Sequence, residues 1–146
     1  MKIPINVLVV DDEKDFVEML SLRLKEHGEN VLAAYDGNQC LSLLAQNEDT
    51  DVVILDIKMP GMDGIETLRE IKHRFPIVEV ILLTGHGSID TAVEGMKLGA
   101  FDYLNKPAEF DELTEKLENA RRRKAEHEER IRKAEAQALV RRTGGI

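Results

Sequence analysis

Acidic, hydroxyl and basic side chains follow four separate apolar runs of the chain. Asp11 and Asp12 come directly after the first run, Asp56 after the third, Thr84 after the fourth, and Lys106 shortly after the fifth. If these runs are strands of one parallel sheet, their carboxyl ends bring all five side chains to the same edge. This joint placement is the main chemical signal in the sequence.

Three carboxylates at one edge predict a bound hard cation. Each pair at 4 Å repels by about 4 kcal/mol if the effective dielectric constant is near 20. Oxygen ligands in a site left open to water and phosphate oxygens suit Mg²⁺ better than Ca²⁺, and no Cys or His residues have the spacing of a zinc site. With Mg²⁺ and Lys106 offsetting the charge, one carboxylate can attack phosphorus and become an aspartyl phosphate.

Each of these residues also has an ordinary structural interpretation when it is taken singly. Asp12 can cap a helix that begins just after it. Asp56 at a strand end can be a turn former, Thr84 a loop hydroxyl, and Lys106 a solvated surface charge. Their joint placement at four strand ends favours the functional interpretation.

The elements that must position these residues are five short apolar runs with helical stretches between them. The first, third and fourth runs are almost continuous in Val, Ile and Leu, which is typical of strands covered on both faces of a parallel sheet. We expect strands at residues 5–10, 30–34, 51–55, 78–83 and 99–104.

Helices are predicted by apolar spacing and by capping residues. Residues 14–27 form an amphipathic pattern that stops at Gly28. Further helices are expected to begin at Asp36, Asp63 and Ser88, and the last near Glu109. Two of these starts, at Asp36 and Asp63, have a Gln or Glu three residues later, which favours a capping box. Strand and helix thus alternate five times, which predicts an α/β, doubly wound parallel sheet.

Four segments of the chain, "VVDDE", "VILDIKMPGMDG", "LLTGHGS" and "GAFDYLNKP", resemble the signature segments of bacterial response-regulator receiver domains, in the same order and at matching spacings. The later segments are most similar to receivers of nitrogen-regulator-type transcription activators. The resemblance implies a (βα)5 fold with a five-stranded sheet in the flavodoxin-like order 2-1-3-4-5. It covers residues 5 to about 120, so we expect a receiver domain over 1–120 and a charged helical tail or linker over 121–146.

The resemblance also implies roles for the acidic residues. Asp56 would accept the phosphoryl group. Asp12 would bind Mg²⁺ directly, Asp11 would act through water or a neighbouring contact, and the backbone carbonyl of Lys58 would complete the protein's share of the metal site. The family pattern further implies a cis bond between Lys106 and Pro107.

Other roles concern the switch that reads the phosphoryl group. By the same resemblance, Thr84 and Lys106 would hold the phosphoryl oxygens, and Tyr103 would swing inward when Thr84 moves. Lys58 and His86 lie two residues after Asp56 and Thr84, where they would tune the lifetime of the phosphorylated state. The face of the fourth helix, fifth strand and fifth helix would then change its affinity for a partner.

The expected function is a phosphorylation-activated switch of a two-component system, with a histidine kinase or phosphotransfer protein as phosphodonor. Such a receiver is not an enzyme beyond assisting its own phosphorylation and dephosphorylation. The alternative is a Mg²⁺-dependent phosphatase or phosphotransferase acting through an aspartyl phosphate. It is disfavoured because dehalogenase-type enzymes have a second Asp where this chain has Lys58. A third hypothesis is a dimer adaptor that needs no phosphorylation.

Composition limits the remaining classes of function. The 146 residues allow one domain with an appendage, and the single Cys40 excludes an internal disulfide. The start of the chain lacks a signal-peptide pattern, and no apolar run approaches the roughly 18 residues of a membrane span. We therefore expect a cytoplasmic protein with no membrane partner.

The tail differs from the rest of the chain in charge. Residues 121–142 hold nine Lys or Arg against four Glu, so this segment is +5 and the rest carries −13 of the total of −8. Three Glu–Arg or Glu–Lys pairs at i,i+4, beginning at Glu126, Glu128 and Glu129, favour a continued helix. A heptad read from Phe110 to Ala138 is poor in its middle.

Dimerisation through this helix, or through the face of the fourth helix, fifth strand and fifth helix, stays open. Nucleic-acid binding is disfavoured because the tail has interleaved Glu and no aromatic residues. The chain could be a piece of a longer regulator or a stand-alone receiver, and the sequence does not decide between them.

Overall fold

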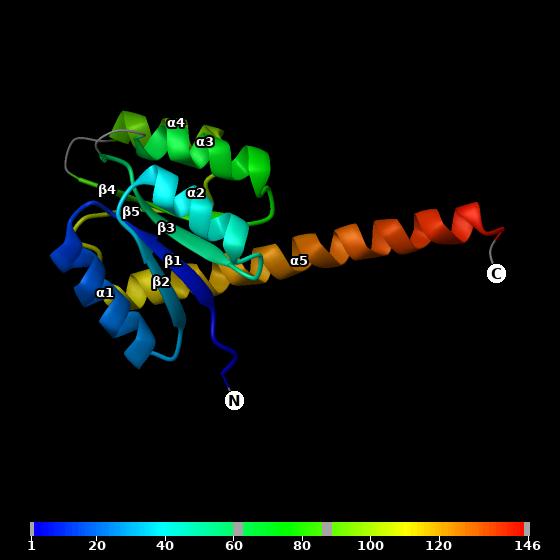
Figure 1. Ribbon diagram of the computed structural model, residues 1–146, viewed down its shortest axis with the longest axis horizontal. Coiled ribbons are helices and arrows are strands. Elements are labelled where there is room, and N and C mark those ends of the chain that lie inside the picture. Colours follow the sequence, from blue (N-terminus) through cyan, green and yellow to red (C-terminus); the bar gives the residue numbers. More distant parts are fainter. Residues whose placement is uncertain (1, 60–62, 86–88, 145–146) are drawn as a thin grey trace.

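A computed structural model describes residues 2–59, 63–85 and 89–144 and contains alternating strands and helices (Figure 1). Ten elements follow one another along the chain: β1 Asn6–Val10, α1 Lys14–Glu26, β2 Asn30–Ala34, α2 Gly37–Gln46, β3 Val52–Asp56, α3 Gly64–Arg74, β4 Glu79–Thr84, α4 Ile89–Lys97, β5 Asp102–Asn105 and α5 Phe110–Arg142. The predicted strand and helix alternation is confirmed.

The five strands form one parallel sheet in the order β2-β1-β3-β4-β5. Helices α2 and α3 pack on one face of the sheet, with α4 beside them, and α1 and α5 pack on the other. Both β3 and β4 are buried along their whole length. Burial on both faces explains why these strands read as unbroken apolar runs.

Helix starts follow the predicted capping chemistry in two places. The Asp36 carboxylate accepts from the Gln39 N–H, and the Gln39 side chain accepts in return from the Tyr35 N–H. Asp63 accepts from the Glu66 N–H at the start of α3. Helix α1 is different, because its N-cap residue is Glu13 and the Asp12 side chain does not cap it. Asp12 is thus left facing the edge where the other acids lie.

The fifth strand begins later than predicted. Residues 99–101 do not belong to β5, because Gly99 has a φ of +107° and its N–H bonds to the carbonyl of Met96. Gly99 and the Ala100 N–H, which bonds to Gly95, close the end of α4. The apolar residues of this segment pack against the core from a helix end, so hydrophobicity alone placed the strand start three residues too early.

Gly95 has a packing reason for being glycine. A Cβ at this position would lie 2.2 Å from the Cδ1 atom of Leu82 on β4. The absence of a side chain at Gly95 thus allows the close contact of α4 with the sheet.

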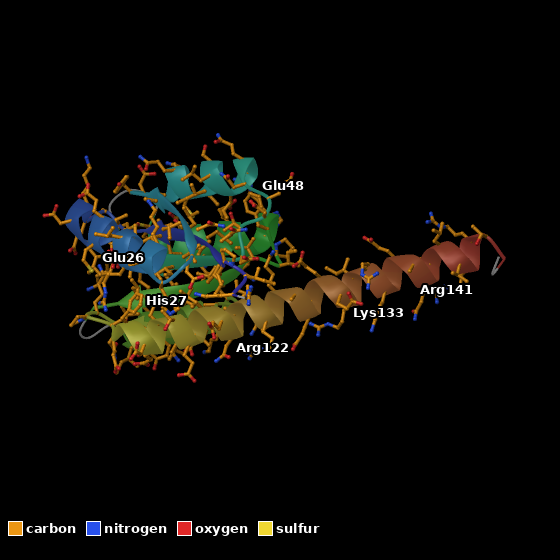
Figure 2. The ribbon with its side chains drawn as sticks, turned by 90° about the horizontal axis from the view of Figure 1, so that it is seen from below. Glu26, His27, Glu48, Arg122, Lys133 and Arg141 are labelled. Carbon is orange, nitrogen blue, oxygen red and sulfur yellow. The ribbon has the colours of Figure 1, made fainter. Side chains whose placement is uncertain are left out.

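Helix α5 continues as one helix of 33 residues, well past the last contact with the sheet (Figures 1 and 2). Its first half packs through Leu113, Leu117 and Ala120. Beyond them, Lys124 is buried and its Nζ lies 3.1 Å from Asp51, which stands just before β3. The neighbouring Arg123 pairs with Glu79 at the start of β4 at 2.5 Å. The folded core thus includes residues beyond position 120.

The ion pairs within the exposed part of α5 differ from the predicted ones. In the described residues the pairs formed are Lys124–Glu128 and Glu129–Arg132, rather than pairs from Glu126 or between Glu128 and Arg132. The helix itself is as predicted and ends before Gly144. Among the described residues, no helix is long and apolar enough to span a membrane.

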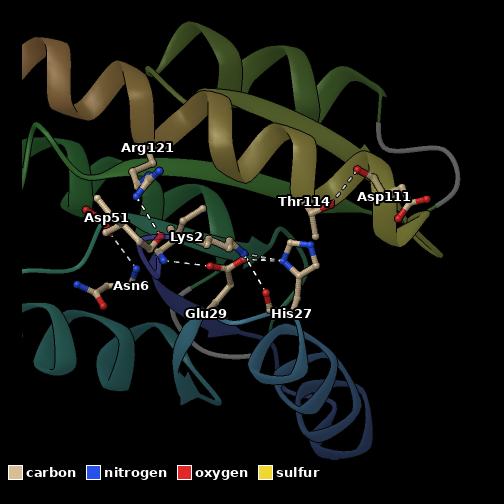
Figure 3. A network of polar contacts seen from close by, with 10 residues as sticks. Lys2, Asn6, His27, Glu29, Asp51, Asp111, Thr114 and Arg121 are labelled. Atoms are coloured by element: carbon tan, nitrogen blue, oxygen red, sulfur yellow. Dashed lines mark hydrogen bonds and ion pairs between the residues drawn. The ribbon is translucent and has the colours of Figure 1, made fainter.

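A polar network lies at the end of the sheet opposite the acidic cluster, where β1 and β2 begin (Figure 3). The buried Glu29 carboxylate accepts from Lys2, from the Ile5 N–H at 3.0 Å, and contacts the His27 ring at 2.8 Å. Burial alone raises the pKa of Glu29, but these hydrogen bonds outweigh it and hold the pKa below its usual range. Nearby, Arg121 of α5 donates to the carbonyl of Ile3. The network fastens the N-terminus to α1, β2 and α5.

Candidate functional site

Three carboxylates converge at the carboxyl edge of the sheet, as the sequence predicted. Asp11 follows β1 and is 0% exposed, Asp56 ends β3 and is buried, and Asp12 is exposed. One oxygen from each of the three lies within 4.8 Å of the others. The hydrogen bond from the Glu13 N–H at 3.0 Å holds Asp11 in place. Two carboxylates of the cluster are therefore buried, and the cluster is open to solvent at Asp12.

The loop after β3 is folded back against Asp56. The Lys58 N–H donates to Asp56 Oδ1 at 3.2 Å, while the Lys58 side chain is exposed. The Gly64 N–H donates to the Ile57 carbonyl at 2.9 Å, so α3 begins directly behind the carboxylate. A Cβ on Gly64 would lie 2.4 Å from the Asp56 carbonyl oxygen. Only glycine allows this close approach.

Lys106 supplies the positive charge of the cluster. A cis peptide bond joins it to Pro107, as the resemblance implied. Its Nζ lies 2.5 Å from Asp11 Oδ2 and 3.9 Å from Asp56 Oδ2. It also lies 4.4 Å from the ring centroid of Phe16, a cation–π contact that the sequence did not predict. Lys106 is thus held between the acids and an aromatic face.

The cluster makes the ionised form of Asp56 costly. Burial is the main cause, and the negative charge of Asp11 adds to it, so the pKa of Asp56 rises to about 6 although Lys106 opposes the shift. Burial lowers the pKa of Lys106, but its contacts with Asp11 and Asp56 outweigh this and raise it. The site therefore favours additional positive charge beside Asp56.

The predicted switch residues lie on β4, which pairs with β3, and on β5, the edge strand that pairs with β4. Thr84 ends β4 and is 2% exposed. Its hydroxyl lies 3.0 Å from the side-chain oxygen of Asn105 on β5. Tyr103, two residues earlier on β5, is 38% exposed and so stands on the outside of the sheet. His86 lies outside the described residues, as does Ser88.

Sequence reasoning missed three residues that shape the site. Gly64 was recoverable, since a glycine directly after a capping Asp indicates a crowded helix start. Phe16 lies within the amphipathic pattern of residues 14–27, which gives no sign of a contact with Lys106. Asn105 had no visible signal, because its importance comes from the pairing of β4 with β5, which puts it opposite Thr84.

The donor set fits a hard divalent cation. All three side chains offer carboxylate oxygens, Asp12 is open to water, and no described sulfur or imidazole ligand joins them in the group. Oxygen ligands with free positions for water are the preference of Mg²⁺. The described His side chains lie elsewhere: His73 is exposed on α3, His127 lies on α5 beyond the core, and His27 belongs to the network at the opposite edge.

The family model and the most similar relatives point to the same family. The family model described as "Response regulator receiver domain" matches residues 7–118. The transcriptional regulatory protein ZraR of Salmonella typhimurium is 43% identical over 116 residues, which are 80% of this chain and 26% of that protein. A putative NtrX-like response regulator of Rickettsia bellii is 43% identical over 118 residues, 80% of this chain and 24% of that protein. The chain spans about a quarter of these relatives.

Solved structures agree with this comparison. A response regulator receiver domain protein from Clostridium thermocellum superposes with a TM-score of 0.80 at 41% identity, covering 83% of this chain and 97% of that one. NtrX from Brucella abortus, solved in complex with ADP, gives a TM-score of 0.81 at 32% identity, covering 87% of this chain and 29% of that one. Fold, sequence segments and acidic edge coincide, and the chain belongs to the response regulator receiver domain family.

Proposed function

We propose that this chain is a phosphorylation switch that accepts a phosphoryl group on Asp56 with the help of Mg²⁺. The observation that carries the proposal is the convergence of Asp11, Asp12 and Asp56 within 4.8 Å, with Lys106 beside them. Asp11, Asp12, Asp56 and the Lys58 carbonyl would hold the ion. Bound there, Mg²⁺ would neutralise charge on the carboxylates and on the transferred phosphoryl oxygens.

The protein's own residues would then carry out the remaining steps. An oxygen of the Asp56 carboxylate attacks the phosphorus of the donor, and the donor's leaving group departs with the electrons of the broken bond. The Lys106 ammonium, already 3.9 Å from Asp56, turns toward the new phosphoryl oxygens. The Thr84 hydroxyl donates to one of them. Lys58 and His86, which flank the site in sequence, would set water access and so the lifetime of the phosphate.

An apolar surface beside the site would respond to phosphorylation by changing its affinity for a partner. Ile89, Val93 and Met96 are exposed and share one side of α4, and Tyr103 on the neighbouring β5 is also exposed. In this proposal Thr84 moves toward the phosphoryl group and Tyr103 fills the space that it leaves. The face of α4, β5 and α5 then changes its affinity for a partner or for a second copy of the chain.

An enzymatic role as a phosphatase is the weaker candidate. That chemistry needs an acid to protonate the leaving group, and the residue two positions after Asp56 is Lys58, whose side chain is exposed. A receiver needs no such acid because its acyl phosphate is the signal. A sustained multi-turnover rate on phosphate esters would favour the enzyme.

The partners follow from the family. Receiver domains of response regulators are phosphorylated by histidine kinases or phosphotransfer proteins, and we propose such a donor, in the cytoplasm, for this chain. We also propose that the receiver proper extends past the predicted boundary at 120 as far as Lys124, and that the rest of residues 121–146 is a helical tail or linker, with α5 as a second candidate dimer surface. The junction overlaps the core, because Arg123 and Lys124 still pair with it.

The test is to treat the full chain with Mg²⁺ and a small acyl phosphate and to measure the intact mass. We expect the addition of one phosphoryl group. No addition should occur when the metal is chelated beforehand, and none should occur in Asp56→Asn. Asp49→Asn, at an exposed acid remote from the cluster, serves as the matched control and should label normally. Equal labelling of Asp56→Asn and the wild-type chain would refute the proposal.

A further inference from the structure

We propose that Asn105 is a positioning residue that holds Thr84 in its unphosphorylated arrangement and thereby sets how readily the switch turns on. The inference rests on the proposed function and concerns its regulation. It starts from one contact: the Thr84 hydroxyl donates to Asn105 Oδ1 at 3.0 Å. The other acceptor near that hydroxyl, the Leu104 carbonyl, is 3.5 Å away and makes at most a weak bond.

The sheet pairing fixes this contact. Thr84 and Asn105 are register partners on β4 and β5, and the Lys106 N–H donates to the Thr84 carbonyl at 2.7 Å. Directly opposed residues on neighbouring strands are close enough for their side chains to interact. Asn105 therefore meets Thr84 without any rearrangement of the backbone.

Asn105 and a phosphoryl oxygen exclude each other as acceptors of the Thr84 hydrogen. A hydroxyl carries a single hydrogen, so Thr84 can donate either to Asn105 or to a phosphoryl oxygen on Asp56. Each phosphorylation must therefore break the contact with Asn105. Because Thr84 is 2% exposed, water does not readily replace the lost partner. The Asn105 contact thus stabilises the unphosphorylated state selectively.

Asn105 also stands where it can couple the site to the outer surface. Side chains alternate along a strand, so Tyr103 and Asn105 lie on the same side of β5. Their register partners Leu82 and Thr84 lie on the matching side of β4. Lys106, the next residue, reaches the acids. Asn105, the last residue of β5, therefore contacts the switch hydroxyl, and Lys106, directly after it, contacts the acids.

The experiment compares beryllofluoride binding, in the presence of Mg²⁺, by the wild-type chain and by Asn105→Val. Beryllofluoride mimics a phosphoryl group on a carboxylate without covalent turnover. Loss of one neutral hydrogen bond from the unbound state predicts binding that is about 3- to 10-fold tighter in the variant. Without beryllofluoride, the NMR signals of the Tyr103 ring should move part of the way toward their bound positions.

A double-mutant cycle isolates the contact. In a Thr84→Val background the hydroxyl is gone, so adding Asn105→Val should change beryllofluoride affinity by less than about twofold. Asn30→Val is the matched control, because Asn30 is an exposed asparagine on the opposite edge strand. It should leave the affinity unchanged. Asn105→Ala, which alters strand propensity in the opposite direction, should tighten binding like Asn105→Val.

The outcomes separate this inference from the proposed function. If the wild-type chain binds no beryllofluoride with Mg²⁺, the proposed function fails. If the wild-type chain binds it and both Asn105 variants bind with equal or weaker affinity, the function stands and the role of Asn105 is overturned. The role of Asn105 is also overturned if Asn105→Val tightens beryllofluoride binding as much in the Thr84→Val background as in the wild-type chain.

Discussion

At the scale of single residues, the ionised carboxylate of Asp56 destabilises the metal-free protein. Its pKa of about 6 exceeds the value near 3.9 of an unfolded Asp, so the folded chain binds a proton more tightly than the unfolded chain. The free energy of unfolding therefore falls as pH rises from about 4 through 6, and the lost part stays lost above this range.

Asp56→Asn should accordingly stabilise the metal-free protein. Because the Asn cannot ionise, we expect the free energy of unfolding at pH 7.5 to rise by about 1–2 kcal/mol and its decline between pH 4 and 6 to flatten. Urea denaturation across this pH range in a chelating buffer measures both. Asp12→Asn is the contrast, since Asp12 is exposed and should give a smaller gain. A destabilised Asp56→Asn would contradict the assigned cause.

Lys106 acts in the metal-free protein as a fixed counter-ion that a metal must compete with. Lys106→Met leaves the buried Asp11 without its 2.5 Å partner, so we expect a loss of about 1–3 kcal/mol in the absence of metal. Mg²⁺ should then raise the melting temperature more in the variant than in the wild-type chain, because the cation replaces the missing charge. Calorimetry with and without Mg²⁺ tests this. An unchanged or smaller Mg²⁺ shift would show that Lys106 does not share the acids with the ion.

At the scale of elements, the start of α3 is built against the strand that ends in Asp56. Gly64→Ala would put a Cβ 2.4 Å from the Asp56 carbonyl and 2.5 Å from the Ile57 Cα, both backbone atoms that cannot turn aside. We expect lower stability together with impaired Mg²⁺ binding and acyl phosphate labelling. Circular dichroism melts and intact-mass labelling measure these losses.

Gly95→Ala is the matched control for that change. Its Cβ would meet the end of the Leu82 side chain, which can adopt another rotamer, and the site lies on α4 rather than beside Asp56. It should affect stability more than labelling. If Gly64→Ala labels like the wild-type chain, the packing of α3 does not position the carboxylate.

At the scale of the whole molecule, the layered fold could be predicted from the sequence, and the predictions that were wrong have physical reasons. Buried parallel strands produce long apolar runs, and capping residues such as Asp36 and Asp63 mark helix starts. The predicted start of β5 was wrong because the helix end closed by Gly99 is as apolar as a strand. The acidic edge was predictable because parallel strands end together. The Thr84–Asn105 contact was not, since strand register is not written in local sequence.

The extent of the folded unit makes a prediction about truncation. A chain cut after residue 120 loses Lys124, which is buried and paired with Asp51, whereas a chain cut after residue 130 keeps that pair. Removing one partner of a buried ion pair is costly, so the shorter chain should be less stable by about 2–4 kcal/mol. Urea denaturation of the two truncated chains compares them. Equal stabilities would place the boundary at 120, as the resemblance alone suggested.

The most direct measurement is the chemical location of the phosphoryl group. The chain is labelled with a small acyl phosphate and Mg²⁺, reduced with borohydride, which converts an aspartyl phosphate to homoserine, and mapped by peptide mass spectrometry. The account predicts homoserine at position 56 in the labelled sample and none without Mg²⁺. Conversion at another acid, or a phosphoryl group that borohydride does not remove, would contradict it.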